Sequence, residues 1–291
     1  MSPRSDLRPV FAAAVTGIQV GAAIVATSFV IDQTSPAALA MLRYMIGALC
    51  LLPALPMSRP FSFARQDVLP IALLGITQFG ILVALLNFGL KYIPAGRAAL
   101  IFATFPLLTM LLASALGKEA MTRNKVIGVL CSFMGVALVL GDDLLIGSDE
   151  GKEWLGALAV FASAFCGAAC SVLYRPYLER YPVVPVSAFA MFASVLFLAF
   201  LAAGEGFFNA FPQISVGGWA AILFIGLSSG LGYFLWLWAL GRSTPTKVTI
   251  FLALSPVTAA LLSITLLDED ASIMLFCGIA SVSAGLWLAN R

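Results

Sequence analysis

The candidate chemistry of this chain lies in single polar side chains that interrupt long apolar runs. Amide side chains occur at Gln19, Gln78 and Asn87, each inside a predominantly hydrophobic stretch. An amide in such surroundings is costly unless it faces a polar partner, so these groups are expected to point inward, toward other helices or a ligand. Amides, hydroxyls and aromatic rings can hold a small solute without breaking its bonds. The predicted substrate-binding residues are Gln19, Gln78, Asn87, Thr104, Ser229, Tyr233, Trp236 and Ser255.

Each of these residues also has a purely structural interpretation. Gln19 and Gln78 could join helices to one another, at about 0.6 kcal/mol per hydrogen bond in a bilayer. Serine and threonine hydroxyls often donate only to the backbone of their own helix. Tyr233 and Trp236 could stack on a planar substrate, or form a belt at the membrane surface with Trp238. We assign Trp238 to the belt and leave both roles open for the other two.

Charged side chains are almost absent from the apolar runs. Arg43 is the one charge well inside a run; it could pair with a substrate carboxylate or extend to a helix end, and we favour the second, structural role. Glu119 and Glu269 stand at the ends of runs, where loop contacts or gates are expected, and histidine does not occur. The sequence therefore predicts no proton relay carried by the protein.

The same inventory argues against an enzyme. The chain has no histidine, no paired carboxylates inside the apolar runs and no glycine-rich phosphate loop. The five cysteines all fall within apolar runs, where we interpret them as packing residues and not as a disulfide framework. No catalytic residue, metal site or cofactor is predicted.

Composition points to the lipid bilayer as the solvent of this chain. Of its 291 residues, 61% are hydrophobic and 10% are charged, whereas a soluble domain has about 25% charged residues. The net charge of +2 is too small to indicate a nucleic-acid partner. A helix needs about 20 apolar residues to cross the hydrocarbon layer. Ten segments meet that length approximately: 9–31, 36–57, 68–90, 94–116, 124–141, 154–174, 184–203, 216–240, 243–267 and 272–290.

Basic residues between these segments predict the orientation. With a cytoplasmic N-terminus, twelve of the sixteen Lys and Arg residues fall inside, and three, at Lys91, Arg97 and Lys152, fall outside. Both termini are therefore expected in the cytoplasm.

An internal repeat organises the chain. Residues 70–141 compared without gaps with residues 220–291 share Pro106/Pro256 and Glu119/Glu269 at a constant offset of 150 positions. The two late glycine pairs Gly128/Gly278 and Gly135/Gly285 and several leucine pairs also match. We therefore predict two repeats, at 1–145 and 150–291, of five helices each. Because five is odd, the second repeat enters the membrane from the opposite side, and such inverted repeats are typical of carriers with alternating access.

The repeated prolines are the predicted hinges of such a carrier. Pro106 and Pro256 each interrupt an apolar helix and remove the N–H partner of the carbonyl four residues earlier, at Phe102 and Leu252. Such a break in lipid must face protein or a cavity. The alternative is a static kink that only shapes packing. We favour the hinge because the proline recurs in both repeats.

These motifs resemble the EamA-like family of the drug/metabolite transporter superfamily over essentially the whole chain. The resemblance rests on Ser35-Pro36 with Arg43, on GLKYIPAGRAAL at 89–100, and on FPLLTMLLASALGKE at 105–119. The second half repeats them as ALGRSTPTKVTI at 239–250 and SPVTAALLSITLLDE at 255–269. Many members have a Trp-Gly pair in the first helix, where this chain has Val20-Gly21.

The resemblance implies an all-α integral membrane protein with ten transmembrane helices in two inverted repeats, located in a bacterial-type inner membrane. It implies a secondary transporter of a small metabolite, most simply an exporter of amino acids or related compounds. The alternative is an importer of a vitamin or nucleotide-like metabolite such as riboflavin. Transport would proceed by facilitated diffusion, by exchange or through the charge of the substrate itself. The protein would be a monomer or a homodimer.

Overall fold

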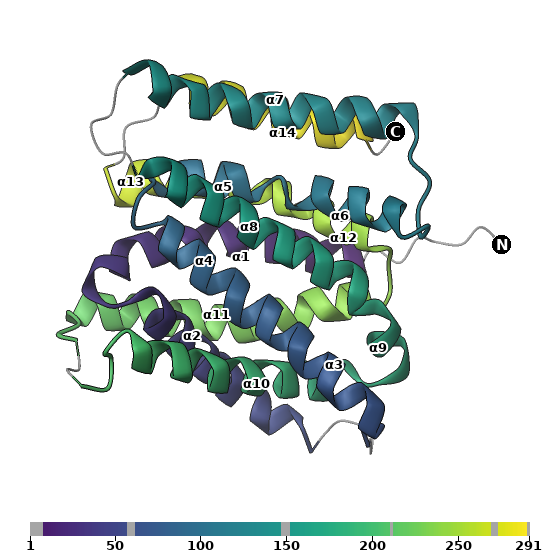
Figure 1. Cartoon of the computed structure of the whole chain (residues 1–291), viewed down its shortest axis with the longest axis vertical. Coiled ribbons are helices and arrows are strands. Elements are labelled where there is room, and N and C mark those ends of the chain that lie inside the picture. Colours follow the sequence, from purple (N-terminus) through teal and green to yellow (C-terminus); the bar gives the residue numbers. More distant parts are fainter. Residues whose placement is uncertain (1–7, 57–61, 147–151, 210–211, 269–272, 290–291) are drawn as a thin grey trace.

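The structure is a computed structural model that describes residues 8–56, 62–146, 152–209, 212–268 and 273–289 (Figure 1). All regular elements in these ranges are helical, which confirms the predicted all-α class. The first half contains α1 (Arg8–Val30), α2 (Pro36–Leu51), α3 (Arg65–Gly75), α4 (Leu82–Gly89), α5 (Ala95–Phe102), α6 (Phe105–Ala115) and α7 (Arg123–Ile146). The second contains α8 (Glu153–Leu173), α9 (Arg175–Arg180), α10 (Val183–Gly204), α11 (Val216–Leu240), α12 (Pro245–Thr249), α13 (Leu254–Leu266) and α14 (Ile273–Ala289).

Three of the predicted spans are built from shorter pieces. A π-helical segment, Ile76–Ile81, joins α3 to α4. The span that contains Pro106 is divided into α5 and α6, and the span that contains Pro256 consists of α12, a 3₁₀ segment and α13. Helical geometry therefore changes in the middle of the bundle, where a uniform α-helix would be the default in lipid.

Eight of the described helical segments are long and apolar enough to cross a bilayer. The apolar part of α14 is shorter, at Ile273–Leu288, and α7 is described only in part at the level of side chains. The count of ten spanning helices therefore stays a prediction. In Figure 1, α1 begins and α14 ends at the same end of the bundle.

The two halves pack into each other. α1 of the first half packs against α11 and α13 of the second, and α8, which occupies the place of α1 in the second half, packs against α4 and α6 of the first. Equivalent helices also pack together, α2 with α10 and α7 with α14. The halves thus share one interior.

Helices α7 and α14 form the outermost layer in Figure 1 and hold each other by reciprocal contacts. Ser132 donates a hydrogen bond to the carbonyl of Val282 at 3.3 Å, and Ser281 donates one to the carbonyl of Cys131 at 2.8 Å. Each hydrogen bond joins two positions that are 150 residues apart, so exchanging the halves maps each pair onto itself. This is the pattern that a local two-fold axis produces.

Glycines allow these two helices to approach closely. A Cβ on Gly135 would meet the carbonyl oxygen of Gly278, and a Cβ on Gly285 would meet that of Gly128. Residue numbers that increase along α7 thus lie opposite residue numbers that decrease along α14. These two equivalent helices are therefore antiparallel.

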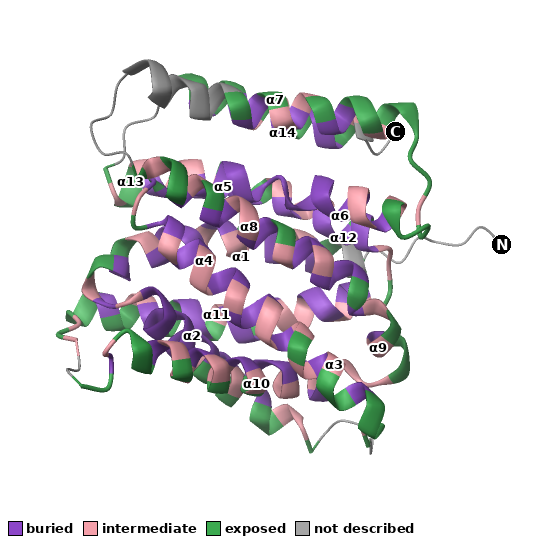
Figure 2. Cartoon of the chain, viewed as in Figure 1, coloured by how far each residue is buried: buried purple, intermediate pink, exposed green. Residues whose placement is uncertain are grey.

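Burial follows the pattern expected for a membrane protein. Buried residues fill the interior in Figure 2, and the outer faces of the helices are exposed. Large hydrophobic side chains occupy those outer faces, including Phe11, Leu130 and Phe200, which are 72%, 63% and 77% exposed. A soluble protein rarely exposes so much apolar surface, whereas a bilayer covers it.

Gly21 tests the close packing between the halves. A Cβ at this position would lie 2.5 Å from the carbonyl oxygen of Ser255 and 2.8 Å from the Cβ of Thr258. We expect Gly21→Ala to cost about 1–3 kcal/mol, because the overlap includes rigid backbone. The melting temperature of the purified protein in detergent should fall. Gly204→Ala is the matched control, since its Cβ would meet nothing within 4 Å; an equal loss in both variants would contradict this account.

Candidate solute site in the centre of the bundle

A buried polar pair joins α2 to α11 near the middle of the bundle. The Nε of Arg43 donates a hydrogen bond to the Oγ of Ser229 at 2.6 Å, and the Ser229 hydroxyl also contacts the carbonyl of Ile225 in its own helix. Arg43 is 6% exposed and Ser229 is fully buried. The expectation that Arg43 extends to a helix end is therefore wrong: a hydroxyl at the middle of α11 lies within reach, so the guanidinium binds there.

Three aromatic rings lie beside this pair. Tyr44, Phe79 and Tyr233 have mutual ring-centroid distances of 4.6 to 5.7 Å, and the hydroxyls of the two tyrosines are hydrogen-bonded at 3.0 Å. The rings come from α2, from the π-helical segment and from α11. The Arg43 guanidinium carbon lies 5.5 Å from the centroid of the Tyr44 ring, within the range of a cation–π interaction. We call Arg43, Tyr44, Phe79, Ser229 and Tyr233 the central cluster.

The π-helical segment gives Gln78 an unusual environment. Such segments are rare and frequently occur at functional sites. Gln78 is 3% exposed, and its Oε1 has no hydrogen-bond partner among the described residues. A buried acceptor without a donor costs about 1–3 kcal/mol, so a donor from a bound solute or water would be stabilising there. This is the strongest structural feature of the predicted site residues.

Gln19 reaches across from α1 to α11. Its Nε2 donates to the Oγ of Ser228 at 3.3 Å, and a Cβ on Gly232 would overlap its Oε1. The absence of a side chain at Gly232 therefore makes room for this amide. Gln19 is partly buried.

The other predicted site residues bind mainly to the protein itself. The Nδ2 of Asn87 donates to the carbonyl of Pro36 at 3.0 Å, and its Oδ1 has no partner among the described residues. Thr104 donates to the carbonyl of Ile101 within its own chain segment. Trp236 is buried, with its ring centroid 5.9 Å from that of Phe105. Contact with a substrate stays a prediction for all three.

Helix breaks lie next to both predicted hinges. Pro106 is the second residue of α6 and Pro256 the third residue of α13, each just after a change of helical geometry. Pro256 has no N–H to donate to the carbonyl of Leu252. This carbonyl instead accepts a hydrogen bond from the Ser255 hydroxyl at 2.7 Å. The hydroxyl thus replaces the missing N–H.

The end of the bundle where α1 begins and α14 ends carries polar contacts between the halves. Glu119 accepts a hydrogen bond from the Thr246 hydroxyl at 2.8 Å and forms an ion pair with Lys125 at 3.1 Å. Lys118 donates to the carbonyl of Val172 at 3.1 Å. The contact between Glu119 and Thr246 therefore joins the two halves at this end.

The opposite end is also joined. The Oε1 of Gln33 accepts hydrogen bonds from the backbone N–H and the hydroxyl of Ser215, both at 2.9 Å. The carboxylate of Glu205 accepts one from the backbone N–H of Ala37 at 3.0 Å. Hydrogen bonds thus connect the halves on both sides of the central cluster.

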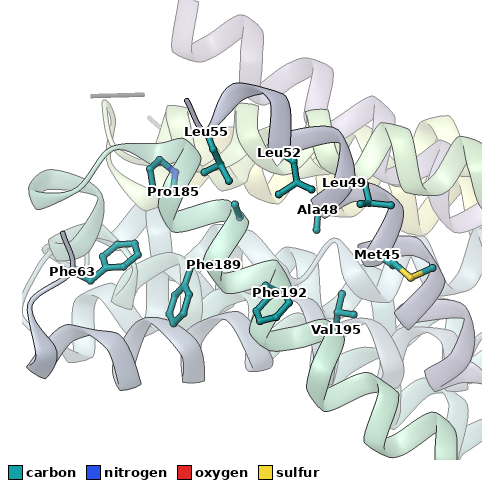
Figure 3. Close-up of a pocket in the computed structure, with 11 residues that line it drawn as sticks. Met45, Ala48, Leu49, Leu52, Leu55, Phe63, Pro185, Phe189, Phe192 and Val195 are labelled. Atoms are coloured by element: carbon teal, nitrogen blue, oxygen red, sulfur yellow. The ribbon is translucent and has the colours of Figure 1, made fainter. Parts of the chain in front are cut away.

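A separate groove between α2 and α10 is lined only by hydrophobic side chains (Figure 3). Its volume is about 510 Å³, and its wall includes Leu49, Leu52, Phe189 and Phe192. It offers no hydrogen bond to a polar solute. The central cluster is the better candidate site.

The family comparison decides what kind of protein this is. The model of the EamA-like transporter family matches residues 7–141 and, a second time, residues 154–291. The chain belongs to the EamA-like transporter family. It is therefore a multi-pass membrane transporter with a small-molecule substrate, as the motifs predicted.

Individual EamA-like relatives align over most of the chain. A "probable terminal-alkyne amino-acid exporter" of Streptantibioticus cattleyicolor is 27% identical over 288 residues, which cover 98% of this chain and 94% of that protein. The uncharacterized transporter YyaM of Bacillus subtilis is 28% identical over 250 residues, 84% of this chain and 81% of its own. A crystal structure with 22% identity has a TM-score of 0.71 and covers 95% of this chain and 94% of that chain, which shows the fold alone.

The sequence did not single out two members of the central cluster. Tyr44 and Phe79 each follow a residue that was considered, Arg43 and Gln78, but a ring inside an apolar run has the appearance of ordinary core. Gln33 and Glu205 were also missed, because a polar residue at the end of a span is usually solvated. The one available signal was that Tyr44 and Phe79 each follow a polar residue that is costly to bury.

The pair of tyrosine hydroxyls allows a direct test of the cluster. We expect Tyr44→Phe and Tyr233→Phe to destabilise the protein individually and to show a coupling energy of about 0.6 kcal/mol in a double-mutant cycle, because each hydroxyl is the other's partner. Equilibrium unfolding in mixed detergent micelles measures it. Strictly additive effects would show that this hydrogen bond does not form.

Proposed function

We propose that this EamA-like chain is a secondary transporter that exports amino acids or related small compounds across the inner membrane. The observation that carries this proposal is the central cluster: both halves of a transporter contribute polar and aromatic side chains to one buried position. The substrate class is supported by the relative from Streptantibioticus cattleyicolor, which is described as an amino-acid exporter and aligns over nearly the full length.

Alternating access is the mechanism that the arrangement of the halves supports. Equivalent helices α7 and α14 are antiparallel, as expected if the repeats, proposed at 1–145 and 150–291, have inverted topology with ten spans. Two such halves have near-equivalent states that open to opposite sides. The polar contacts at the two ends would then break in alternation, while the central cluster holds the solute.

The cytoplasmic side is proposed from the positive-inside rule. Lys118, Lys125 and Lys247 lie at the end of the bundle where α1 begins, whereas Lys91 and Arg97 lie at the other end. Both termini would then be cytoplasmic, and the Glu119–Thr246 contact would be the inner gate. Energy would come from the solute gradient, from exchange or from the charge of the solute.

Reconstitution tests this function directly. Proteoliposomes that contain the purified chain are loaded with unlabelled propargylglycine, a terminal-alkyne amino acid, or with the standard amino acids, and uptake of the labelled compound is followed. Counterflow above that of empty liposomes is expected for at least one amino acid. Failure with all of them would overturn the proposed substrate class.

Gln78 is expected to be required for transport. Replacing it with leucine removes the buried amide that a solute could use while keeping a side chain of similar size. We expect Gln78→Leu to abolish counterflow and to leave the yield of folded protein unchanged, because the lost Oε1 has no partner within the described chain.

Gln66→Leu is the control for this substitution, since Gln66 is exposed near the start of α3. It should transport as the unmodified protein does. Full activity in Gln78→Leu would remove Gln78 from the site.

Pro256 is expected to set the turnover rate. Pro256→Ala restores an N–H that can bond to the Leu252 carbonyl and favours a regular helix. We expect the turnover number to fall several-fold while solute affinity is retained, as a hinge requires. Pro185→Ala, in the first turn of α10 where the missing N–H matters little, is the control. Unchanged turnover in Pro256→Ala would leave the proline as a static kink.

A further inference from the structure

We infer that the guanidinium of Arg43 binds a carboxylate of the transported solute, so that the transporter selects compounds with a free carboxylate over the matching amides and amines. This inference rests on the proposed transport function and deepens it. It assigns the anion-binding residue and the group on the solute that it recognises.

Burial makes the charge of Arg43 costly. The residue is 6% exposed and lies near the middle of the span Pro36–Ala54, away from both ends where water could solvate it. A charged side chain at this depth almost always faces the interior and pairs with another group. Binding of an anion beside Arg43 would therefore lower the free energy of the protein.

No carboxylate of the described residues neutralises Arg43. The described ion pairs use Arg97, Lys125, Arg175 and Arg180, and their acidic partners lie near helix ends. The contacts of Arg43 are a neutral hydroxyl and an aromatic ring, those of Ser229 and Tyr44. Within the described part of the chain, the positive charge has no counter-ion.

The bound Nε leaves the rest of the guanidinium for a ligand. Ser229 accepts from Nε at 2.6 Å, and neither Nη nitrogen makes a hydrogen bond to a described residue. The Nη nitrogens are not among the fully enclosed polar atoms without a partner, so they still border open space. Two N–H groups of one guanidinium match the two oxygens of a carboxylate, which makes such a pair strong and directional.

The surroundings strengthen this pair. The Tyr44 ring lies 5.5 Å from the guanidinium carbon and packs against the rings of Phe79 and Tyr233, and charge-assisted hydrogen bonds are stronger in such a less polar medium. The position is also unique to one half, because α10, the helix equivalent to α2, contains no arginine or lysine. One solute carboxylate therefore meets one cation.

A structural role for Arg43 makes a different prediction. If the residue only ties α2 to α11 through Ser229, the acid and the amide of one compound would bind equally well. The comparison of acid with amide therefore separates the two roles, even in the unmodified protein.

Binding is measured with the full chain in detergent, as an increase in melting temperature with ligand concentration. The probes are the standard amino acids, propargylglycine, 4-pentynoate, which lacks the amino group, and the primary amides of the acids that bind. The variants are Arg43→Gln, which removes the charge, and Ser229→Ala, which keeps the charge but releases the guanidinium. Arg175→Gln is the control, because Arg175 is an exposed arginine paired with Glu179.

We expect the acid to bind at least roughly 10-fold more tightly than its amide, as the loss of a charge-assisted hydrogen bond implies. Arg43→Gln should weaken acid binding by roughly 10- to 100-fold and leave amide binding unchanged. Ser229→Ala should weaken acid binding several-fold, and Arg175→Gln should change neither. If Arg43→Gln does not fold, the comparison of acid with amide and the Ser229→Ala variant still test whether Arg43 binds the carboxylate.

Several outcomes would overturn the inference: equal binding of acid and amide, unchanged acid binding in Arg43→Gln, or no binding of any carboxylate probe. The failures of the two proposals can be told apart. If 4-pentynoate binds through Arg43 and no amino acid does, the amino-acid class is wrong and the carboxylate site stands. If amino acids bind regardless of Arg43, the export proposal stands and the carboxylate site is wrong.

Discussion

Water is excluded from the middle of a membrane-spanning bundle, so each polar group there must find its partner within the protein or in a ligand. This constraint accounts for the hydrogen bonds of the interior described above. Thr104 and Ser255 donate to nearby carbonyls, Asn87 to the carbonyl of Pro36, and the two tyrosines of the central cluster to each other. Among the described residues, the buried groups that stay without a partner, such as the Gln78 Oε1, are few and stand out for that reason.

Repetition followed by divergence explains how such a site arises. Two similar halves that pack reciprocally bring equivalent positions close together near the axis that relates them. Phe79 and Ser229 are such a pair, 150 positions apart, and both belong to the central cluster. One has become an aromatic wall and the other the anchor of Arg43. The site is asymmetric because identical halves could not supply both chemistries.

Much of the architecture could be predicted from residue patterns, and less of the site. Apolar length gave the helices, and the matching prolines gave both the repeat and the breaks in the helices that contain Pro106 and Pro256. The π-helical segment at Ile76–Ile81 could not be foreseen, because no residue type requires it. Arg43 was misjudged because a sequence shows the depth of a side chain but not its neighbour across the bundle, here Ser229. The hydroxyl that receives it is 186 positions away.

The reciprocal bonds between α7 and α14 have a mechanical consequence. Ser132 and Ser281 bind across the line that exchanges the two helices, and points near a rotation axis move least. A rocking motion about that line would change both bond lengths only slightly. The layer of α7 and α14 would then act as a pivot, and the displacement of the other helices would increase with their distance from it. The largest excursions would fall on the opposite flank, where α2 lies against α10.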